Sequence, residues 1–533
     1  MEKVLQNEYL LNEILQAFED RDDQVPDITT MHSAALVCRA FRKPAEDKLW
    51  RTLESLLPIL KLLPTFHFSR ESGSWFLHGP IRSVDIERLL QVTARVQRIF
   101  LSREYKVEAS TYLALSRALG ERPLLPNLRD LDISVRSPPA TSTIGLQLLI
   151  SPNQTSISLA MNSNNIDNVN SPNHHDCSLY MQRLASENAI GITLVSIVNI
   201  KPVPEVLDAI FSFKNLSQLQ LQVRSLTEGD ISGIDGQVFL ERLAALENLA
   251  SLNLSVFLFN WNSMESQKLI HMPNLTELKL DCCTVLLCSQ ILQSLKFDAL
   301  NTFSLQFSLP DPNQPHDSVF PWRRFFGALE ACSLSKLSLV KLYLSSSNPP
   351  NLGTQSAEQL QQLYPGLSFD GWRQHLLRFK FRDLRIKFPL FPSLSNDDLN
   401  IMAVAWPALE LLNLSSATHI SLFNTSALGL ICNSFPNLQD LSLDINASQV
   451  DKPPHNLSWH KLRKLELNLL NWSRRTDDVK RLAALVDTLF PFVIAFAGNG
   501  WEITEPINEQ LQELQAARTR ERRRMAVIGN RRL

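Results

Sequence analysis

The chain has 533 residues and a formal net charge of −2, and 44% of its residues are hydrophobic against 20% charged. This composition is that of a globular chain, and its length requires two or more units or a repeat array. A near-neutral chain is not drawn to nucleic acid by bulk charge, so we expect no nucleic-acid partner. Only 16 glycines are present, which argues against glycine-rich phosphate loops.

The cysteines and the apolar runs indicate in which cellular compartment the protein is expected. The seven cysteines form no C-x-x-C pair, a pattern typical of reduced thiols in an intracellular protein. No basic segment precedes an apolar core at the start, and no apolar run reaches about 18 residues without charge. We therefore expect an intracellular protein of the cytoplasm, the nucleus or both, with no membrane partner.

From about Asn7 to Trp50, short apolar stripes recur at helical spacing between polar residues. Thr29 or Thr30 is suited to cap the second helix, and Pro44 is expected to end that helix and start a third. So small a unit cannot enclose all of its large side chains, so the surplus apolar surface should meet something else. The stripes consist of Leu10, Leu11, Ile14, Leu15 and Phe18, then Ala34, Leu36, Val37, Ala40 and Phe41, and finally Leu49 and Trp50.

The segments LLNEILQAF, AALVCRAF and KLW resemble an F-box, the motif that docks a substrate receptor onto the Skp-type adaptor of a cullin-based ubiquitin ligase. The match departs from the family at Leu11, where a proline is usual, and at Phe41, where a tryptophan is common. The resemblance implies a Skp-type adaptor and a cullin scaffold as partners. The residues that it assigns to adaptor binding are Leu10, Leu11, Ile14, Leu15, Phe18, Leu36, Val37, Cys38, Phe41, Leu49 and Trp50.

Another interpretation of this stretch is a helical cap that shields the end of a repeat array, as terminal repeats require. The two interpretations differ in exposure. A cap turns Leu10, Ile14, Leu36 and Val37 inward against the first repeats, whereas a docking motif leaves them open to solvent.

After the helical stretch, a segment of the form L-x-x-L-x-L returns along the chain, often after a proline and a polar residue. Clear neighbours lie about 24 to 33 residues apart, the period range of leucine-rich repeats. The leucines at the fourth and sixth positions alternate with polar residues, as on a strand with one buried face. Helical patterns lie between the copies, which include NLRDLDI, NLSQLQL, NLASLNL, NLTELKL, FRDLRI, ALELLNL, NLQDLSL and KLRKLEL.

Because one such repeat cannot enclose a core, successive repeats must stack and share one. The sequence therefore predicts an α/β fold in which a short N-terminal helical, F-box-like unit precedes a curved, irregular leucine-rich-repeat solenoid. Parallel strands should line its concave side and helices its outside. The predicted boundaries are 1–65 for the helical unit, 66–85 for a linker, 86–500 for the solenoid and 501–533 for a basic helical tail, partly disordered.

The repeats resemble the leucine-rich-repeat half of F-box receptors, especially in the large F-box families of basidiomycete fungi. SLLPILKLLP, DIERLLQVTARVQRI and a late DTLFP helix carry this resemblance. One departure is the asparagine or cysteine usual nine positions after the first leucine, because Thr284, Thr418 and Ala447 stand there instead. That asparagine satisfies backbone groups at the turn, so its absence predicts irregular repeats of variable length.

The residues between the inward leucines should point into the concave side, where a target protein is expected to bind. Their charges are mixed, with amides and hydroxyls between, which suits a protein or peptide rather than a polyanion. Any solenoid strand needs polar residues toward solvent, so the same pattern also fits a face without a ligand. The target-binding candidates are Gln218, Gln220, Asn253, Glu277, Lys279, Asp383, Arg385, Asn413, Asp440 and Lys464.

Catalytic patterns are scarce, and HExxH, GxSxG and Walker-type sequences are all missing from the sequence. Three groups of candidate metal ligands fit structural roles better, as part of a repeat strand, as buried small hydrophobes or as a surface loop. We therefore expect no metal, no cofactor and no enzyme activity. The groups are Asp130 with Asp132, the cysteines Cys282, Cys283 and Cys288, and His174, His175 and Cys177.

Together these features lead to the hypothesis of a non-catalytic substrate-recognition subunit of an SCF-type ubiquitin ligase. The F-box would dock the Skp-type adaptor and the repeats would hold a target protein. The alternative is a leucine-rich-repeat scaffold or recognition protein with a helical cap and no ubiquitin role. The arginines of the tail, Arg518, Arg520 and Arg522 to Arg524, fit a nuclear address or a solvated, frayed end, and the pattern favours the latter.

Overall fold

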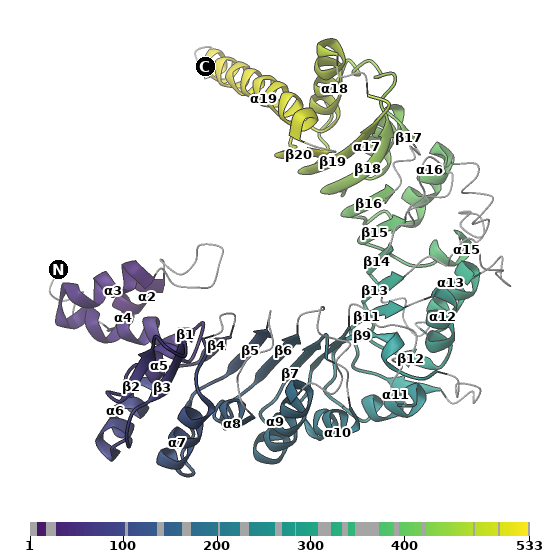
Figure 1. The fold of residues 1–533 in the computed structure, drawn as a ribbon. Helices are drawn as coiled ribbons and strands as arrows, with labels where there is room; N and C mark the ends of the chain where they lie inside the picture. The colour runs from purple at the N-terminus through teal and green to yellow at the C-terminus, as the bar shows by residue number, and fades with distance from the viewer. Residues whose placement is uncertain are drawn as a thin grey trace. The chain divides into compact units, whose positions relative to one another are not determined.

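A computed structural model of the chain shows two compact units, Met1–Ser263 (unit 1) and Met264–Leu533 (unit 2). In each unit parallel strands lie side by side, and helices pack on one face of the sheet (Figure 1). The structure describes residues 8–16, 28–101, 105–135, 143–161, 172–200, 203–223, 234–261, 269–282, 284–307, 321–332, 339–346, 373–388, 394–416, 423–472, 475–498 and 501–530.

Unit 1 begins with three helices and continues as strands that alternate mostly with helices. Its sheet has the order β1-β4-β5-β6-β7-β8-β9, and β2 and β3 form a separate antiparallel hairpin. The elements are α2 (Glu8–Gln16), α3 (Ile28–Val37), α4 (Arg39–Arg51), β1 (Thr52–Leu53), α5 (Leu57–Leu60), β2 (Phe66–Ser69), β3 (Ser74–Leu77), α6 (Ser83–Thr93), β4 (Arg98–Phe100), α7 (Ala109–Leu119), β5 (Asp130–Val135), α8 (Thr143–Gln147), β6 (Ser156–Met161), α9 (Pro172–Asn188), β7 (Leu194–Val198), α10 (Pro204–Ser212), β8 (Gln218–Gln222), α11 (Gly236–Ala244) and β9 (Ser251–Ser255).

Unit 2 repeats the same alternation. Its sheet has the order β11-β13-β14-β15-β16-β18-β19-β20, with β17 paired to β18 and a small parallel pair of β10 and β12. The elements are β10 (Ile270–Met272), β11 (Glu277–Cys282), α12 (Val285–Gln293), β12 (Leu295–Phe297), β13 (Thr302–Phe307), α13 (Pro321–Cys332), β14 (Lys341–Ser346), α15 (Arg373–Leu376), β15 (Asp383–Phe388), α16 (Asn396–Ala405), β16 (Leu411–Ser416), β17 (Phe423–Asn424), α17 (Ser426–Ser434), β18 (Asp440–Asn446), β19 (Lys464–Leu470), α18 (Thr476–Leu489), β20 (Ala495–Gly498) and α19 (Trp501–Asn530).

The fourth and sixth positions of each L-x-x-L-x-L copy form the core, as predicted. In β8, Leu219 and Leu221 are buried, while Gln218, the first residue of the strand, is exposed. Each buried leucine contributes about 1.5–3 kcal/mol through removal of apolar area from water. Strand register brings the buried positions of neighbouring strands together, with Val195 and Ile197 on one side and Leu252 and Leu254 on the other.

Repeat length varies, as predicted. The register partners Leu194 and Gln218 are 24 residues apart, whereas Lys341 and Asp383 are 42 residues apart. The strands nevertheless pair in parallel with a continuous register, so the differences in repeat length lie in the segments that connect the strands.

The turns do contain regularly placed asparagines, although we expected their role to be lost. In five repeats an asparagine three residues before the strand donates from its side chain to a carbonyl in the turn of the preceding repeat. This bond joins successive turns, and it lies at a different position from the usual one. The bonds run from Asn127 to Ala94 (2.7 Å), Asn153 to Pro126 (3.0 Å), Asn215 to Ile190 (3.0 Å), Asn248 to Lys214 (3.2 Å) and Asn437 to Pro407 (3.0 Å).

The predicted linker at 66–85 is instead an ordered part of unit 1. It contains the β2–β3 hairpin and the start of α6. The backbone of Trp75 bonds to Lys106 (2.7 Å) and Glu108 (2.9 Å), which fixes the hairpin beside the first repeats. The sheet also starts earlier than predicted, because β1 already pairs with β4.

The predicted tail at 501–533 is helical, as expected, and its first half differs from a solvated tail because it packs on the end of the sheet. Ile507 and Leu511 of α19 are buried. Three of its polar side chains donate to backbone carbonyls in and before β20, the last strand. They are Asn508 to Phe496 (3.0 Å), Gln515 to Val493 (2.9 Å) and Arg518 to Pro491 (3.1 Å). Across the described ranges, every helix is too short or too polar to bridge a lipid bilayer.

Candidate functional site

The N-terminal helices enclose a small core of their own. Leu15, Met31 and Ala45 form its centre, and Phe41 and Leu49 pack partly against it. Leu11 is also buried. Leu11 and Leu15 were predicted to bind the adaptor, but they lie inside, because they occupy one face of α2 and the unit closes that face first.

Four of the predicted adaptor-binding side chains are exposed. Leu10 and Ile14, on the neighbouring face of α2, are 39% and 42% exposed. Leu36 and Val37, at the end of α3, are 73% and 72% exposed. Cys38 and Trp50 are half-buried, and Phe18 lies outside the described residues. These four side chains are open to solvent.

The break that exposes Leu36 and Val37 is not where the sequence placed it. Cys38 is extended (φ −160°, ψ 168°) and separates α3 from α4, whereas Pro44 lies inside α4 and does not start it. α3 begins at Ile28, so Thr29 and Thr30 lie within its first turn instead of capping it.

Ion pairs tie the helices to the first repeat strands. The guanidinium of Arg95, which follows α6, lies 2.7 Å from the carboxylate of Asp47 and 3.4 Å from that of Glu46, both on α4. Because α4 also runs directly into β1, the exposed side chains stand on a unit that is fixed to the sheet.

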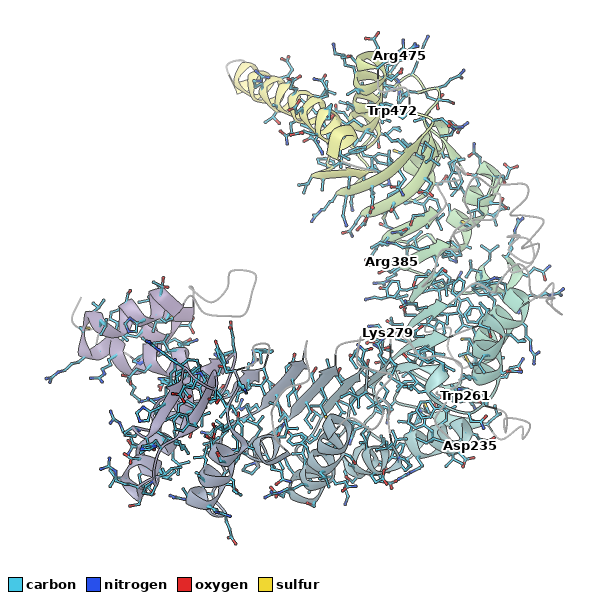
Figure 2. All side chains as sticks on the ribbon, viewed as in Figure 1. Asp235, Trp261, Lys279, Arg385, Trp472 and Arg475 are labelled. Carbon is cyan, nitrogen blue, oxygen red and sulfur yellow. The ribbon has the colours of Figure 1, made fainter. Side chains whose placement is uncertain are left out.

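The second candidate surface is the face of each sheet that the helices do not cover, here called the open face. All of the predicted target-binding residues lie on strands at positions that alternate with buried leucines. Figure 2 shows Lys279 and Arg385 in unit 2 on the side of the strands turned away from the helices. In unit 1 the set is Gln218, Gln220 and Asn253, and in unit 2 it is Glu277, Lys279, Asp383, Arg385, Asn413, Asp440 and Lys464.

The open face of unit 1 is neutral from β6 to β9. The strand positions there carry serines and amides together with Ala160, Leu194 and Val198. The amides are linked within β8 and from β8 to β9. Gln220 donates to Gln222 (2.7 Å), which donates to Asn253 (2.9 Å). Such a row of amides presents both donors and acceptors, which suits hydrogen bonding to a polypeptide.

At the start of unit 1, the two acids of the D-x-D pattern lie on β5. Asp130 pairs with Arg98 (2.8 Å). Burial raises the pKa of Asp132, and a hydrogen bond from Ser158 offsets part of that effect. One oxygen of Asp132 is buried without a hydrogen-bond partner. Both acids are therefore part of a repeat strand.

The open face of unit 2 is charged, with Arg385 at the centre of the most connected cluster. Its Nε and Nη2 donate to the two carboxylate oxygens of Asp383, each at 3.0 Å. Tyr343 donates its hydroxyl to Asp383 (2.7 Å), and its ring lies 4.8 Å from the guanidinium carbon. The hydrogen bond to Asp383 raises the pKa of Arg385, and burial together with Asp383 raises the pKa of Tyr343 to about 12.

Other charges of this face are partly paired. Lys279 lies 2.8 Å from Glu277, and Lys464 lies 3.7 Å from Asp440. Within the part of the chain that the structure describes, Lys341 and Lys387 are exposed and form no ion pair.

The sequence analysis missed part of this surface. The copies SISLAM (β6) and KLYLSS (β14) were not recognised as repeats, so Lys341 and Tyr343 were not among the candidates. For SISLAM the only signal was the alternation of apolar and polar residues over a short run, because Gln154 stands where the first leucine is usual. The β14 copy follows L-x-x-L-x-L from Leu339 but has no asparagine before that leucine.

The other candidate ligands within the described ranges lie in α9, in β11 and in α12. Cys288 and Cys332 are buried, and burial raises the pKa of Cys332 to about 12, so both act as small hydrophobes. His174 and His175 lie in the helix α9 rather than in the predicted loop. Among the described residues, no group of three or more histidines, cysteines and acids is placed to hold a metal. Cys283 lies outside the described residues.

Comparison with known proteins gives matches in structure only. No family model matches the sequence, and no curated protein does. A leucine-rich-repeat protein of Legionella pneumophila, LegL7, matches 71% of this chain and 97% of its own with 13% identity and a TM-score of 0.32. A leucine-rich-repeat protein of Leptospira interrogans matches 83% and 99%, with 12% identity and a TM-score of 0.25.

A third similar structure is the plant peptide hormone receptor RGFR1 in complex with RGF2, with 12% identity and a TM-score of 0.26. It covers 76% of this chain, which in turn covers 56% of the receptor. With such low scores, the fold assignment depends on the strand register and the buried leucines described above. On that evidence the chain has the fold of leucine-rich-repeat proteins.

Proposed function

We propose that this chain is the substrate-recognition subunit of an SCF-type ubiquitin ligase. The observation that carries the proposal is the exposure of Leu10, Ile14, Leu36 and Val37, at positions that the F-box resemblance assigns to adaptor docking. Contiguous exposed apolar side chains mark interaction sites, and Leu36 and Val37 are neighbours in the chain. The partners are a Skp-type adaptor and, through it, a cullin scaffold.

Burial of the exposed apolar side chains on docking would contribute enough free energy to affect adaptor binding. Complete burial of one large aliphatic side chain contributes about 1.5–3 kcal/mol. Leu36 and Val37 together then offer about 3–6 kcal/mol before the cost of association is subtracted. A charge at either position would have to be buried without a partner, so it should strongly disfavour docking.

The chain itself needs no catalytic group in this role. A receptor accelerates ubiquitin transfer by holding a lysine of the target near the charged ubiquitin carrier, which replaces a bimolecular encounter. The open faces of the two units are the surfaces proposed to hold the target. The compartment is the cytoplasm, the nucleus or both.

A pull-down with a recombinant Skp-type adaptor tests the proposal. The full chain should recover adaptor, and Leu36→Asp and Val37→Asp should each lower recovery about tenfold or more. Val404→Asp is the matched control, because Val404 is an equally apolar and 84% exposed residue on α16 of unit 2. Equal recovery by all variants would overturn the docking role.

The second candidate is a leucine-rich-repeat scaffold or recognition protein without a ubiquitin role. It is favoured by the ion pairs of Arg95 with α4 and by the direct entry of α4 into β1, because a terminal cap is attached in this way. This candidate predicts that the wild-type chain recovers no adaptor at all.

A further inference from the structure

We propose that the open face over β14 and β15 binds an acidic side chain of the target, a carboxylate or a phosphate, at the free edge of the Arg385 guanidinium. This inference deepens the proposed function and rests on its target-binding part. It names the chemistry that the target must present, which the fold alone does not determine.

The first step is the geometry of Arg385. A guanidinium carries five N–H donors in one plane. Asp383 accepts one hydrogen bond from Nε and one from Nη2. These two nitrogens form one edge of the guanidinium. The other edge, formed by Nη1 and the second hydrogen of Nη2, has no partner among the described residues. A fork of two parallel donors matches the oxygens of a carboxylate or a phosphate.

The second step is that Arg385 is held in place before any ligand binds. Its plane is fixed by the two bonds to Asp383 and by the ring of Tyr343 at 4.8 Å. The side chain is still 45% exposed, so the free edge is accessible. A side chain that is already ordered loses less freedom when a ligand binds, which favours binding.

The third step concerns Asp383, which would otherwise repel an acid. Its carboxylate accepts from Arg385 twice and from Tyr343 once, and its side chain is only 13% exposed. The negative charge is therefore matched by Arg385 and screened from a ligand. Asp383 acts as the support that orients the guanidinium.

The fourth step is the local charge. In register, Lys341 lies beside Asp383, and Lys387 lies beside Ser345. Both lysines are exposed, and neither forms an ion pair with a described residue. With Arg385, the two strands thus place three cations against one carboxylate. Asn413 is the register partner of Arg385 on β16 and adds a neutral amide beside the fork.

The charges on either side restrict the ligand to a peptide with a local acidic group. Glu277 lies on β11, Asp440 on β18 and Glu466 on β19, so a long polyanion across the face would meet carboxylates on both sides. Like charges in apposition are unfavourable. A single acidic residue or phosphorylated residue within a neutral segment meets three cations at the centre, and of the flanking carboxylates only Asp440 acts on Arg385 itself.

Fluorescence anisotropy with the full chain tests the inference. The probes are short labelled peptides that differ only at the centre: glutamate, phosphoserine, glutamine or lysine. At low salt we expect the glutamate or the phosphoserine peptide to bind about tenfold or more tightly than the glutamine peptide. Added salt should reduce this preference. Whichever acidic peptide binds more tightly identifies the source of the anion.

Variants assign the preference to the proposed residues. Arg385→Gln should remove about tenfold of the affinity for the acidic peptide, and Lys341→Gln should remove a smaller part. Arg242→Gln is the matched control, because Arg242 of unit 1 also pairs with an acid, Asp208 (2.6 Å), and lies over a ring, Phe211 (4.1 Å). It is 44% exposed, and its helix lies off the open face.

The outcomes separate this inference from the ligase role. Equal affinity for the acidic peptides and the glutamine peptide would overturn the inference. Equal losses of affinity for the acidic peptide in Arg385→Gln and Arg242→Gln would also overturn it. Adaptor recovery by Arg385→Gln should remain that of the wild type. Selective binding of the acidic peptide by a chain that recovers no adaptor would leave the inference standing and remove the ligase role alone.

Discussion

The open faces of the two units differ in chemistry although their backbones follow one plan. In unit 1, the strands from β6 to β9 present hydroxyls and linked amides such as Gln220 and Gln222. In unit 2, the equivalent positions of β11, β14, β15, β18 and β19 include ions and an aromatic ring, with Arg385 and Tyr343 at the centre, while those of β13 and β16 are uncharged. Both sheets rest on the same pattern of buried leucines.

This difference teaches that fold and binding chemistry are carried by separate sets of residues. Every second strand position packs into the core and determines the sheet. Most of the positions between them face solvent, Ser442 and Asp444 of β18 being buried exceptions, and they determine which ligand the sheet can hold. Unit 1 is suited to hydrogen bonding along a neutral polypeptide, and unit 2 to a charged group. The chain therefore offers two kinds of contact to a protein ligand, hydrogen bonds in unit 1 and ionic contacts in unit 2.

Truncation of core leucines should have the largest effect and test the separation directly. Leu219→Ala in unit 1 and Leu384→Ala in unit 2 should each cost about 2–5 kcal/mol, because both side chains are fully packed. Gln218→Ala and Lys387→Ala, at exposed positions of the same strands, should change stability by no more than about 0.5 kcal/mol. Hydrogen exchange of the strand amides measures both. An outward substitution as costly as an inward one would refute the separation.

Arg518→Ala should cause a smaller loss of stability, and this loss should be confined to unit 2. Arg518 forms an ion pair with Asp487, and both side chains are largely buried. Its removal leaves a buried carboxylate without its cation, so we expect a loss of about 1–3 kcal/mol. Faster hydrogen exchange should appear in β19 and β20 and not in unit 1.

Arg520→Ala in the same helix is the control for Arg518→Ala. Arg520 is exposed, and its only described contact is with the backbone of Ala516 (3.3 Å). Comparable exchange in the two variants would show that α19 contributes nothing specific to the end of the sheet.

The smallest expected effects are pH-dependent and have opposite signs in the two units. In unit 1, burial raises the pKa of Asp132 above its ordinary value of 3.8. Its ionised form therefore weakens the fold at neutral pH, and this penalty disappears as pH falls through the raised pKa toward 3.8. Asp132→Asn should accordingly stabilise unit 1 at neutral pH, by an amount that shrinks on acidification.

In unit 2, burial opposes ionisation of Glu330, but hydrogen bonds from His375 (2.6 Å) and Arg378 outweigh it and lower the pKa below 4.5. Its stabilising contribution is complete above pH 4.5 and is lost as pH falls through the lowered pKa. Glu330→Gln should destabilise unit 2 at neutral pH, with the deficit shrinking in acid. Denaturant unfolding of the two variants at neutral and acid pH checks both signs, and a shared sign would contradict the pKa directions.

The spacing of leucines was sufficient to predict the sheet, because the alternation of inward and outward residues is local. The juxtaposition of Tyr343 with Asp383 was not predictable, because 40 residues separate them and the repeat lengths vary. The packing of α19 against β20 depends on contacts far along the chain. In the helical unit, the spacing identified the apolar residues but not which of them close the small core.

The asparagines three residues before five of the strands have a consequence for how such a chain can change. Each one fastens its turn to the turn before it, as Asn248 does to Lys214. The start of each of these strands is thereby reset, and an inserted or deleted stretch in the connection before it is not carried forward. New segments can accumulate on the rim of the molecule while the surface that meets a partner keeps its rows in line.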